Sequence, residues 1–312
     1  MSSSFNRIAV FGHRGWASSA IVDALIASGA PVKVLYRPDS DVSRLPDKVP
    51  KVAVDVDDDK ALVEALQDVD ILISLVGHEG VEKQYNFIRA VPKTNVKLFV
   101  PSDLGSRVGG EEETIPVLKA KAEVEKASRD AGIPTTVILP GNFAESTFAS
   151  LLVGIDVSGN RIVYTGGSEH HKLNVCTRKY VAAAYAAIFA KTPVSQLQNR
   201  SIGLSEFVVT GSEVAAALER KNGAAPQIFR PSIEQVKEEI AARLQKGDRS
   251  AILLAYRLPW ASGKHLELVG NDVWDVEGYE KTTLDKVVVE GDLEPYKAFP
   301  PQFVALMETT FF

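Results

Sequence analysis

The stretch Ile8-Ala9-Val10-Phe11-Gly12-His13-Arg14-Gly15-Trp16-Ala17-Ser18 decides the fold of this chain. Its apolar start predicts a buried strand, its glycines predict a tight turn, and an amphipathic helix is expected from Trp16 to about Ser28. A strand, a glycine turn and a helix in this order are typical of the segment that binds the pyrophosphate of a dinucleotide. Gly12 can adopt a backbone conformation that side chains forbid, and Gly15 lets the main chain approach a phosphate.

The glycines follow the spacing G-x-x-G-x-x-S, with Ser18 where the usual pattern has a third glycine. A purely structural turn would explain this spacing as well as a nucleotide site does. The apolar run before the turn and the helix after it favour the nucleotide site. We therefore expect His13, Arg14 and Trp16 to contact the cofactor as well. Arg14 either adds positive charge against the pyrophosphate or blocks its approach, and we favour the first interpretation.

A second strand is predicted over residues 31–36, and Arg37 follows it. The end of this strand meets the adenosine ribose in a doubly wound sheet, where an NAD enzyme usually carries an acid. An arginine suits a 2′-phosphate by charge and by its forked geometry, so the cofactor is predicted to be NADP(H). Asp39 is the counter-argument, since a small shift of the loop would make it an NAD-type acid. Arg44 is either a second phosphate ligand or, more simply, a solvated loop cation.

Strands and helices continue to alternate as far as about residue 140. Such alternation favours a parallel sheet with right-handed crossovers, that is, a Rossmann-type doubly wound α/β fold. The acids at 57–59 are explained by helix capping alone, and the acids at 111–113 are expected in a solvated loop. The expected strands are 51–55, 70–77, 96–100 and 135–139, and the expected helices are 57–67, 81–91 and 115–131.

Open α/β sheets bind their ligands at the carboxyl ends of the strands. Residues at these positions are therefore further candidates for cofactor contacts. Ser102 would serve equally well as a helix cap or a turn residue. The candidates are Asp55, Val56, Val76, Gly77, Ser102, Asn142 and Phe143.

Taken together, these stretches resemble the atypical short-chain dehydrogenases/reductases of the isoflavone reductase and NmrA-like group. The resemblance covers roughly the first half of the chain. It implies an NADPH-dependent reductase of a small organic substrate, either an aromatic compound or one with a conjugated carbonyl. The alternative is an NmrA-like regulator that senses NADP(H) without catalysis. The matching stretches are 12–18, 34–37, 62–74, 97–105, 119–124, 132–134 and 141–144.

The resemblance also implies a lysine that contacts the nicotinamide ribose and assists proton transfer. Counting back from the turn at 132–134 places Lys121, rather than Lys119, at that position. An ammonium group there would stabilise a developing alkoxide or enolate and relay a proton. The alternative is one more cation on a solvated helix face. Short-chain dehydrogenases carry a tyrosine four residues earlier, where this chain has Val117, so no tyrosine acid is assigned. The regulators lack the lysine, and Lys121 therefore favours the enzyme.

After Phe148 the alternation weakens. The resemblance implies an NAD(P)-binding domain over residues 1–150 and a smaller α/β substrate region over 151–312, interleaved with the first. In the second half we expect strands at 160–165, 206–210 and 227–230, and helices at 177–190, 212–221, 232–246 and 251–260.

Histidine, cysteine and aromatic residues, most of them in the second half, could suggest a metal site or a substrate pocket, but their spacing does not require either. His170, His171 and Cys176 match no usual zinc spacing, so we expect no metal and a loop pair of histidines that faces solvent or substrate. Four aromatic residues either line a pocket or, more simply, belong to the core. These are Phe143, Phe148, Trp260 and Trp274.

Composition narrows the class of protein. With 312 residues, 45% of them hydrophobic and 24% charged, the chain is typical of a soluble globular protein with a large core. A formal charge of −5 argues against a nucleic acid partner. The lone Cys176 excludes an internal disulfide framework and fits a reducing compartment. No apolar run is long enough to span a bilayer and no secretory signal is evident, so we expect a cytoplasmic protein without membrane contact. We further expect a monomer or homodimer with a small-molecule substrate.

Overall fold

Parallel strands in the order β3-β2-β1-β4-β5 form the central sheet of the protein. The computed structural model describes residues 5–107, 115–248 and 250–312, so the loop expected at 111–113 lies outside the described residues. A parallel bridge between Phe99 and Thr135 continues the sheet into a further set of parallel strands, β6-β11-β14. The strands are β1 (Ile8–Phe11), β2 (Val32–Tyr36), β3 (Lys51–Ala53), β4 (Ile71–Ser74), β5 (Leu98–Val100), β6 (Val137–Leu139), β11 (Ser201–Leu204) and β14 (Val273–Trp274).

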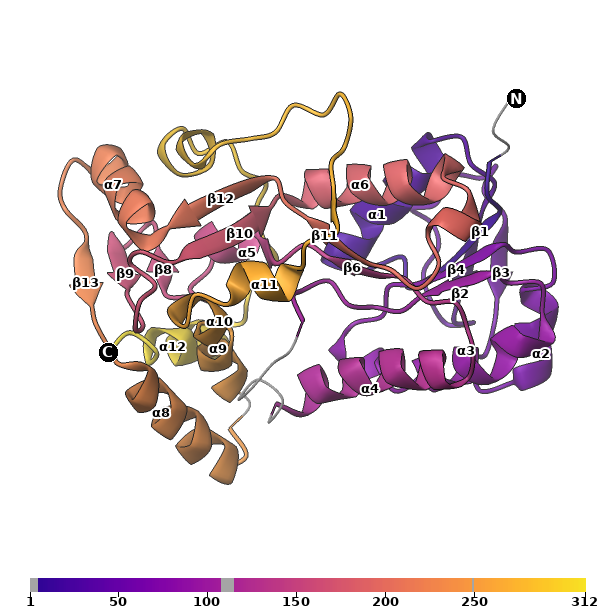
Figure 1. Cartoon of the computed structure of the whole chain (residues 1–312), viewed down its shortest axis with the longest axis horizontal. Helices are drawn as coiled ribbons and strands as arrows, with labels where there is room; N and C mark the ends of the chain where they lie inside the picture. Colours follow the sequence, from indigo (N-terminus) through magenta and orange to yellow (C-terminus); the bar gives the residue numbers. More distant parts are fainter. Residues whose placement is uncertain (1–4, 108–114, 249) are drawn as a thin grey trace.

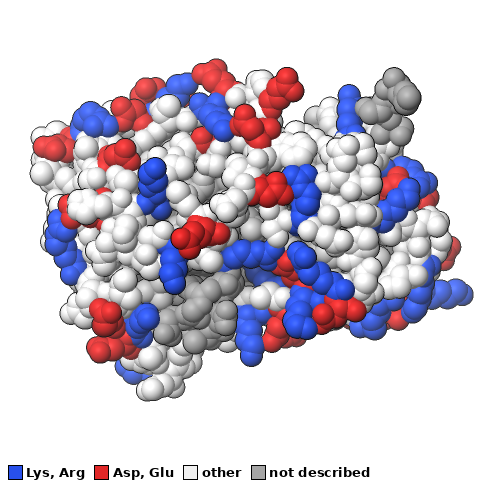
Figure 2. Space-filling model, in the orientation of Figure 1, with Lys and Arg blue, Asp and Glu red and all other residues white. Residues whose placement is uncertain are grey.

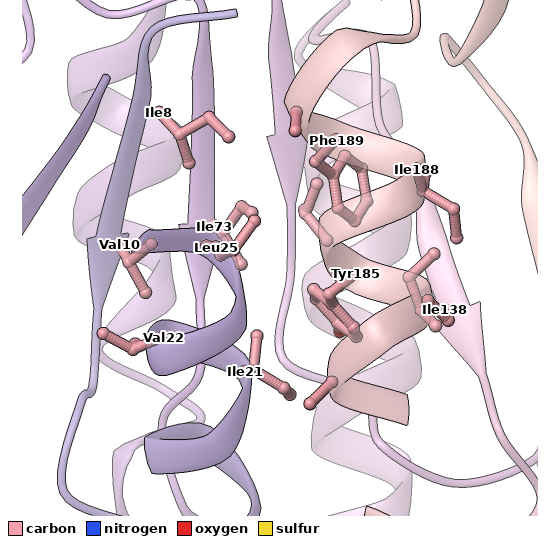
Figure 3. Packing of buried hydrophobic residues seen from close by; sticks show 14 of the residues in the cluster. Ile8, Val10, Ile21, Val22, Leu25, Ile73, Ile138, Tyr185, Ile188 and Phe189 are labelled. Atoms are coloured by element: carbon pink, nitrogen blue, oxygen red, sulfur yellow. The ribbon is translucent and has the colours of Figure 1, made fainter. Parts of the chain in front are cut away.

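Helices cover both faces of this sheet, as the apolar strands require. Ile8 and Val10 of β1 belong to one buried cluster, whereas Ala9 and Phe11 belong to the other. On the first face, α1 (Trp16–Ala27) and α6 (Arg178–Lys191) lie side by side. On the second face lie α2 (Asp59–Ala65), α3 (Gln84–Ala90) and α4 (Pro116–Asp130). Figure 3 shows the first cluster, with Ile21, Val22 and Leu25 from α1 and Tyr185, Ile188 and Phe189 from α6.

The ends of several helices follow directly from the sequence. The side chain of Asp58 accepts hydrogen bonds from the backbone of Lys60 and Ala61, so the acid run does cap α2. Thr177 caps α6 by accepting from the backbone of Tyr180. The expected strands and helices of the first half are all present, most of them shorter by a few residues than the predicted ranges.

The second part of the molecule contains two small sheets, β12-β10-β7 and β13-β9-β8. Figure 1 shows them to the left of the parallel sheet, with the short helices of the C-terminal region around them. The strands are β7 (Asn142–Phe143), β8 (Ile155–Asp156), β9 (Arg161–Val163), β10 (Lys172–Cys176), β12 (Phe207–Thr210) and β13 (Gln227–Phe229). The helices are α5 (Ala144–Phe148), α7 (Gly211–Asn222), α8 (Ile233–Gln245), α9 (Ala251–Ala255), α10 (Leu258–Ala261), α11 (His265–Val269), the π-helix η5 (Asp285–Val289) and α12 (Pro301–Glu308).

The helical stretch expected over residues 251–260 is present but broken. Helix α9 ends at Ala255, and α10 begins at Leu258. Pro259 lies in the first turn of α10, where its missing N–H costs nothing, whereas in a continuous helix it would remove a hydrogen bond. The proline therefore explains the break.

Elements that follow residue 150 complete the layers begun before it. Helix α6 covers the same face of the sheet as α1, and β11 pairs in parallel with β6. A cut at residue 150 would separate α6 from the face that it covers. The division into the ranges 1–150 and 151–312 stays a prediction.

Two surface properties bear on the kind of partner. None of the described helices combines the length and the apolar character that crossing a membrane demands. On the face drawn in Figure 2, lysine and arginine side chains are interspersed with aspartate and glutamate. The expected absence of a nucleic acid partner stays a prediction.

Candidate functional site

The glycine turn after β1 packs tightly against the neighbouring strand. Gly12 has φ +95°, and a Cβ atom on it would lie 2.6 Å from the backbone oxygen of Leu75, just beyond β4. Only glycine fits both the conformation and the space. Gly15 precedes α1, and its carbonyl accepts hydrogen bonds from the Ser18 hydroxyl at 3.1 Å and the Ser19 amide at 2.9 Å. Ser18 is buried, so the third position of the pattern is small because it packs inside.

The two residues between these glycines have different environments. The His13 ring is buried, and its Nε2 atom lies 3.0 Å from the backbone oxygen of Asp41, to which it donates. Arg14 is exposed beside the same loop. A hydrogen bond from Ser43 holds the pKa of Asp41 below its ordinary value, and the charge of Arg14 adds to this effect. His13 therefore fixes the loop after β2, while the Arg14 guanidinium faces outward at the rim of the turn.

Trp16, the first residue of α1, joins parts of the chain that are far apart in sequence. Its ring lies edge-on to Phe143, with centroids 5.3 Å apart, and edge-on to Tyr296 at 4.8 Å. Its indole nitrogen donates to the backbone oxygen of Pro295 at 3.4 Å, and the Arg178 guanidinium stands 5.4 Å from the ring. The structure thus brings together two predicted cofactor residues, Trp16 and Phe143, and adds a C-terminal segment that the sequence did not indicate.

An exposed cation, Arg37, stands at the end of β2. Arg37 is exposed, and within the described parts of the chain its side chain makes no hydrogen bond or ion pair. Arg44 instead pairs with Asp23 on α1, and Asp39 is exposed on the same loop. Of these residues, Arg37 is the one left available to an anionic ligand.

The loops after β4 and β5 are tied to each other through Ser102. Its amide donates to the side-chain oxygen of Gln84, and its hydroxyl donates to the backbone oxygen of Val76, both at 2.8 Å. Gly77 begins the short 3-10 helix η1 (His78–Gly80), and a Cβ atom on it would have no described neighbour within 4 Å. Ser102 therefore sets the shape of this edge, and Gly77 leaves open space beside it.

Asp55 and Val56 follow β3. The Asp55 carboxylate is exposed and accepts a hydrogen bond from the Asp57 amide at 3.0 Å. Val56 is buried in the cluster beneath α2 and α3. A cofactor contact at Val56 would therefore use its backbone.

Lys121 differs from the other lysines of α4. Lys119 and Lys126 are exposed and pair with acids one turn further along, as surface lysines commonly do. The Lys121 side chain is only 13% exposed, and its Nζ atom lies 3.6 Å from a carboxylate oxygen of Asp103, whose side chain is 15% exposed. Asp103 follows β5, so this pair stands at the carboxyl edge of the sheet. The solvated-cation interpretation fails for Lys121.

Burial shapes the charges around this pair. Burial raises the pKa of Asp103, while the charges of Lys121 and Arg107 oppose that rise. His78 reaches solvent, yet partial desolvation lowers its pKa to about 4, and the charges of Lys121 and Lys297 lower it further. His78 is therefore neutral near pH 7, and the two lysines supply the positive charge on this side of the site.

The loop after β6 contains a buried polar group, the side-chain amide of Asn142. The Asn142 side-chain nitrogen is buried and has no hydrogen-bond acceptor among the described residues. Gly141, with φ +71°, donates its amide to the backbone oxygen of Gly105 at 3.0 Å, and so joins this loop to the one after β5. A buried amide nitrogen without an acceptor is costly in an isolated protein, and a ligand oxygen would satisfy it.

The histidines and aromatic residues of the second half lie elsewhere. As expected of a loop pair, His170 is exposed, whereas His171 is half-buried and its Nδ1 atom lies 3.0 Å from the backbone oxygen of Ala261. Among the described residues, no group of three or more possible metal ligands comes together. Of the four aromatic candidates, Phe148 and Trp260 are buried in the core, Trp274 packs against Arg200, and Phe143 lies at the site.

Two hollows open at the opposite edge of the sheet. One, of about 340 Å³, is lined by residues that include Ile8, Val32 and Lys33, and the other lies near Asn6 and Asp70. Both are at the amino ends of the strands, whereas open α/β sheets bind ligands at the carboxyl ends. We therefore leave them out of the candidate site.

The NmrA-like family model matches residues 4–258 of this chain. The chain belongs to the NmrA-like family. Phenylcoumaran benzylic ether reductase Betv6 of Betula pendula is 33% identical to it over 153 residues, which are 45% of this chain and 49% of that protein. Isoflavone reductase homolog IRL of Zea mays is 30% identical over 162 residues, 46% of this chain and 51% of that protein. This NmrA-like chain thus spans about half the length of the curated relatives it matches.

Solved structures resemble this NmrA-like protein over most of its length. Isoflavone reductase superposes with a TM-score of 0.74 at 23% identity, covering 92% of this chain and 99% of that one. The binary complex of leucoanthocyanidin reductase and NADPH from Vitis vinifera gives a TM-score of 0.75 at 17% identity, covering 91% and 98%. These likenesses show the Rossmann-type fold.

Sequence reasoning missed part of the site. Asp103 and His78 were not predicted as site residues. The available signal was weak: each directly follows a predicted site residue at a strand end, Asp103 after Ser102 and His78 after Gly77. The segment that contains Tyr296 and Lys297 has no periodicity and no motif, so nothing in the sequence places it beside Trp16.

Proposed function

We propose that this NmrA-like protein is an NADPH-dependent reductase of a small organic molecule. The observation that carries the proposal is the position of Lys121, largely buried beside Asp103 at the carboxyl edge of the sheet. A regulator that only binds the dinucleotide has no need of a desolvated ammonium group there. The reductase names of its relatives, phenylcoumaran benzylic ether reductase and isoflavone reductase homolog, support the same activity.

The residues at the carboxyl edge fit NADP(H). The glycine turn, in close contact with the chain after β4, suits a pyrophosphate. Arg37 and the Asn142 side-chain nitrogen, neither of which has a partner among the described residues, suit a 2′-phosphate and a polar ligand atom. Related folds have been solved with this cofactor, among them leucoanthocyanidin reductase with NADPH and AtPrR2 with NADP+ and pinoresinol. The residues we propose to hold it are Gly12, His13, Arg14, Gly15, Trp16, Arg37, Asp55, Val56, Val76, Gly77, Ser102, Lys121, Asn142 and Phe143.

When bound, the nicotinamide would supply a hydride. The Lys121 ammonium group would hold the nicotinamide ribose, stabilise negative charge that develops on the substrate oxygen, and pass a proton to it. Asp103 would keep that ammonium group in place. Val117 occupies the position of the tyrosine acid of other short-chain dehydrogenases, so Lys121 takes the larger share of the proton chemistry.

We propose an aromatic substrate, or one with a conjugated carbonyl. Related proteins are named after isoflavones and phenylcoumaran benzylic ethers, and one was solved with pinoresinol. All three compounds are aromatic, which supports this class. The second part of the molecule would wall the substrate site. We further propose a cytoplasmic protein that acts as a monomer or homodimer.

Two measurements test the function. Calorimetry with NADPH and NADH measures cofactor binding, and nicotinamide absorbance follows NADPH consumption over a panel of isoflavones, lignans, phenylcoumaran ethers and quinones. The reductase proposal predicts NADPH binding and consumption with at least one member of the panel. NADPH binding without consumption on any carbonyl or alkene would favour the regulator, and failure to bind either nucleotide would overturn both.

A further inference from the structure

A segment close to the C-terminus lies against the nucleotide turn. Residues 294–299 approach the start of α1, where Tyr296 packs edge-on to the Trp16 ring at 4.8 Å and Pro295 accepts the indole hydrogen bond. In Figure 1 the yellow C-terminal part of the chain leaves the coil of η5, passes through the middle of the molecule and ends in α12. We call residues 294–299 the strap.

The strap is attached at both of its ends. At its start, Glu294 forms ion pairs with Arg178 at 3.2 Å and with Lys179 at 3.4 Å, both in the first turn of α6. At its end, the Phe299 ring packs on Tyr296 at 5.5 Å and on Phe303 of α12 at 5.0 Å. Between these attachments the strap has no strand or helix. Its middle is therefore held by side chains that a ligand could rearrange.

The strap reaches the ends of two neighbouring strands. Trp16 comes directly after the glycine turn of β1, and it touches Tyr296. His78 comes directly after Gly77 beyond β4, and its electrostatic surroundings include the charge of Lys297. Strands β1 and β4 are paired in the sheet. A diphosphate at the amino end of α1 would thus lie near the middle of the strap.

Lys297 is the cation that the strap brings to this place. Its Nζ atom stands 5.6 Å from the centre of the Tyr296 ring and 5.4 Å from that of Phe299, and within the described residues it forms no ion pair with a carboxylate. The side chain is exposed. An exposed ammonium group supported by two rings and left without a counter-ion is available to an anionic ligand.

We propose that the strap binds the dinucleotide, with Lys297 pairing with its phosphate charge and Tyr296 covering it next to Trp16. The inference rests on the proposed function and adds cofactor residues from outside the glycine turn. It also requires that Tyr296 move relative to Trp16 when the dinucleotide enters. Cofactor binding is therefore expected to change the fluorescence of Trp16 and to bury the peptide bond that follows Lys297.

Calorimetry with NADPH tests the strap on the full chain. Lys297→Gln is expected to raise the Kd about fivefold, with a smaller difference at high salt, because one partly exposed charge pair is lost. Lys246→Gln is the matched control, since Lys246 is an exposed cation at the end of α8, and its Kd is expected to equal that of the wild type. An unchanged Kd for Lys297→Gln, with wild-type binding intact, would overturn the strap and leave the proposed function standing.

Limited trypsin digestion gives a second readout without any substitution. Saturating NADPH is expected to slow cleavage after Lys297 at least severalfold, while cleavage after Lys246 stays unchanged. Equal cleavage at Lys297 with and without bound NADPH would contradict the strap. If the wild-type protein binds no nucleotide in calorimetry, the proposed function itself fails, so the two failures are distinguishable.

Discussion

The ammonium nitrogen of Lys121 lies 3.6 Å from a carboxylate oxygen of Asp103, and both side chains are largely buried. One comes from α4 and the other from the loop after β5, so the pair connects a helix on one face of the sheet to the edge where ligands bind. Each charge reduces the cost of burying the other. Asp103 therefore acts as a positioning residue for Lys121, which leads to two predictions.

Replacing the lysine should separate chemistry from binding. We expect Lys121→Ala to lower kcat/KM about 100-fold or more, since proton transfer and charge stabilisation are lost, while the Kd for NADPH changes only a few-fold. Lys119→Ala, on the exposed side of the same helix, serves as the control and should retain full activity. Steady-state kinetics together with calorimetry measure both quantities. Wild-type turnover by Lys121→Ala would remove its assigned role.

Replacing the carboxylate should act through the lysine. Asp103→Asn keeps the shape of the side chain but removes the negative charge beside Lys121. We expect kcat/KM to fall about tenfold and the acidic limb of its pH profile to flatten, because burial raises the pKa of Asp103 and the amide that replaces it takes up no proton as pH falls. A purely structural role would lower the melting temperature without moving the pH profile, so the profile is the deciding measurement.

The choice between the two nicotinamide cofactors should depend on Arg37. Arg37→Asp replaces the available cation after β2 by an acid that accepts hydrogen bonds from a ribose 2′-hydroxyl. The ratio of the Kd values for NADPH and NADH should shift toward NADH by about tenfold or more. Arg44→Ala is the control, because Arg44 already pairs with Asp23. An unchanged ratio in Arg37→Asp would refute its contact with the 2′-phosphate.

The glycine turn should tolerate no side chain at Gly12. In Gly12→Ala the new methyl group would meet the backbone oxygen of Leu75, and the backbone would keep a φ that alanine disfavours. We expect a loss of about 1–3 kcal/mol in the free energy of unfolding from the backbone alone, and weaker NADPH binding. Gly77→Ala is the contrasting variant for stability, because its methyl group would enter open space. Chemical denaturation compares the stability of the two variants, and calorimetry measures NADPH binding by Gly12→Ala.

The buried carboxylate of Glu145, which lies on α5, should make stability depend on pH. Glu145 accepts hydrogen bonds from the Arg178 amide at 3.0 and 3.2 Å, and burial raises its pKa from 4.5 to about 7. Between pH 4.5 and about pH 7, Glu145 therefore keeps its proton in the folded protein but has lost it in the unfolded chain. The contribution of Glu145 to the free energy of unfolding is therefore fully present below about pH 4.5, and it is lost as pH rises through 7.

Glu145→Gln removes this titration. The free energy of unfolding of the variant, minus that of the wild type, should increase between about pH 5 and pH 8 by up to about 3 kcal/mol. Urea denaturation at several pH values measures this difference. Glu64→Gln, at an exposed position of α2, is the control and should show a flat difference. A flat difference for Glu145→Gln would contradict the raised pKa.

The first half of the fold was predictable because each of its elements has a local cause. Parallel strands buried on both faces read as short apolar runs, and Asp58 and Gly132 mark helix ends in the sequence. The second half was less predictable. Strands β10 and β14 pair with strands far away in the chain, and β8 has only two residues.

The candidate site divides in the same way. Gly12 and Lys121 could be chosen from spacing and from the resemblance, since their roles depend on the turn and helix to which they belong. Lys297 and Tyr296 could not be chosen, because their positions depend on how the C-terminal chain packs against Trp16. Asp103 was partly predictable. Its position after a predicted strand follows from the sequence, but its ion pair with Lys121 of α4 does not.

The shared face of α1 and α6 also bears on how the protein is made. While the N-terminal strands emerge from the ribosome, the apolar side chains that later meet Tyr185 and Phe189 have nothing to cover them. The nascent chain therefore exposes an apolar, aggregation-prone surface until α6 has been synthesised, and a chaperone would be most useful during that interval. A gene fragment that stops at residue 150 should accordingly yield insoluble product.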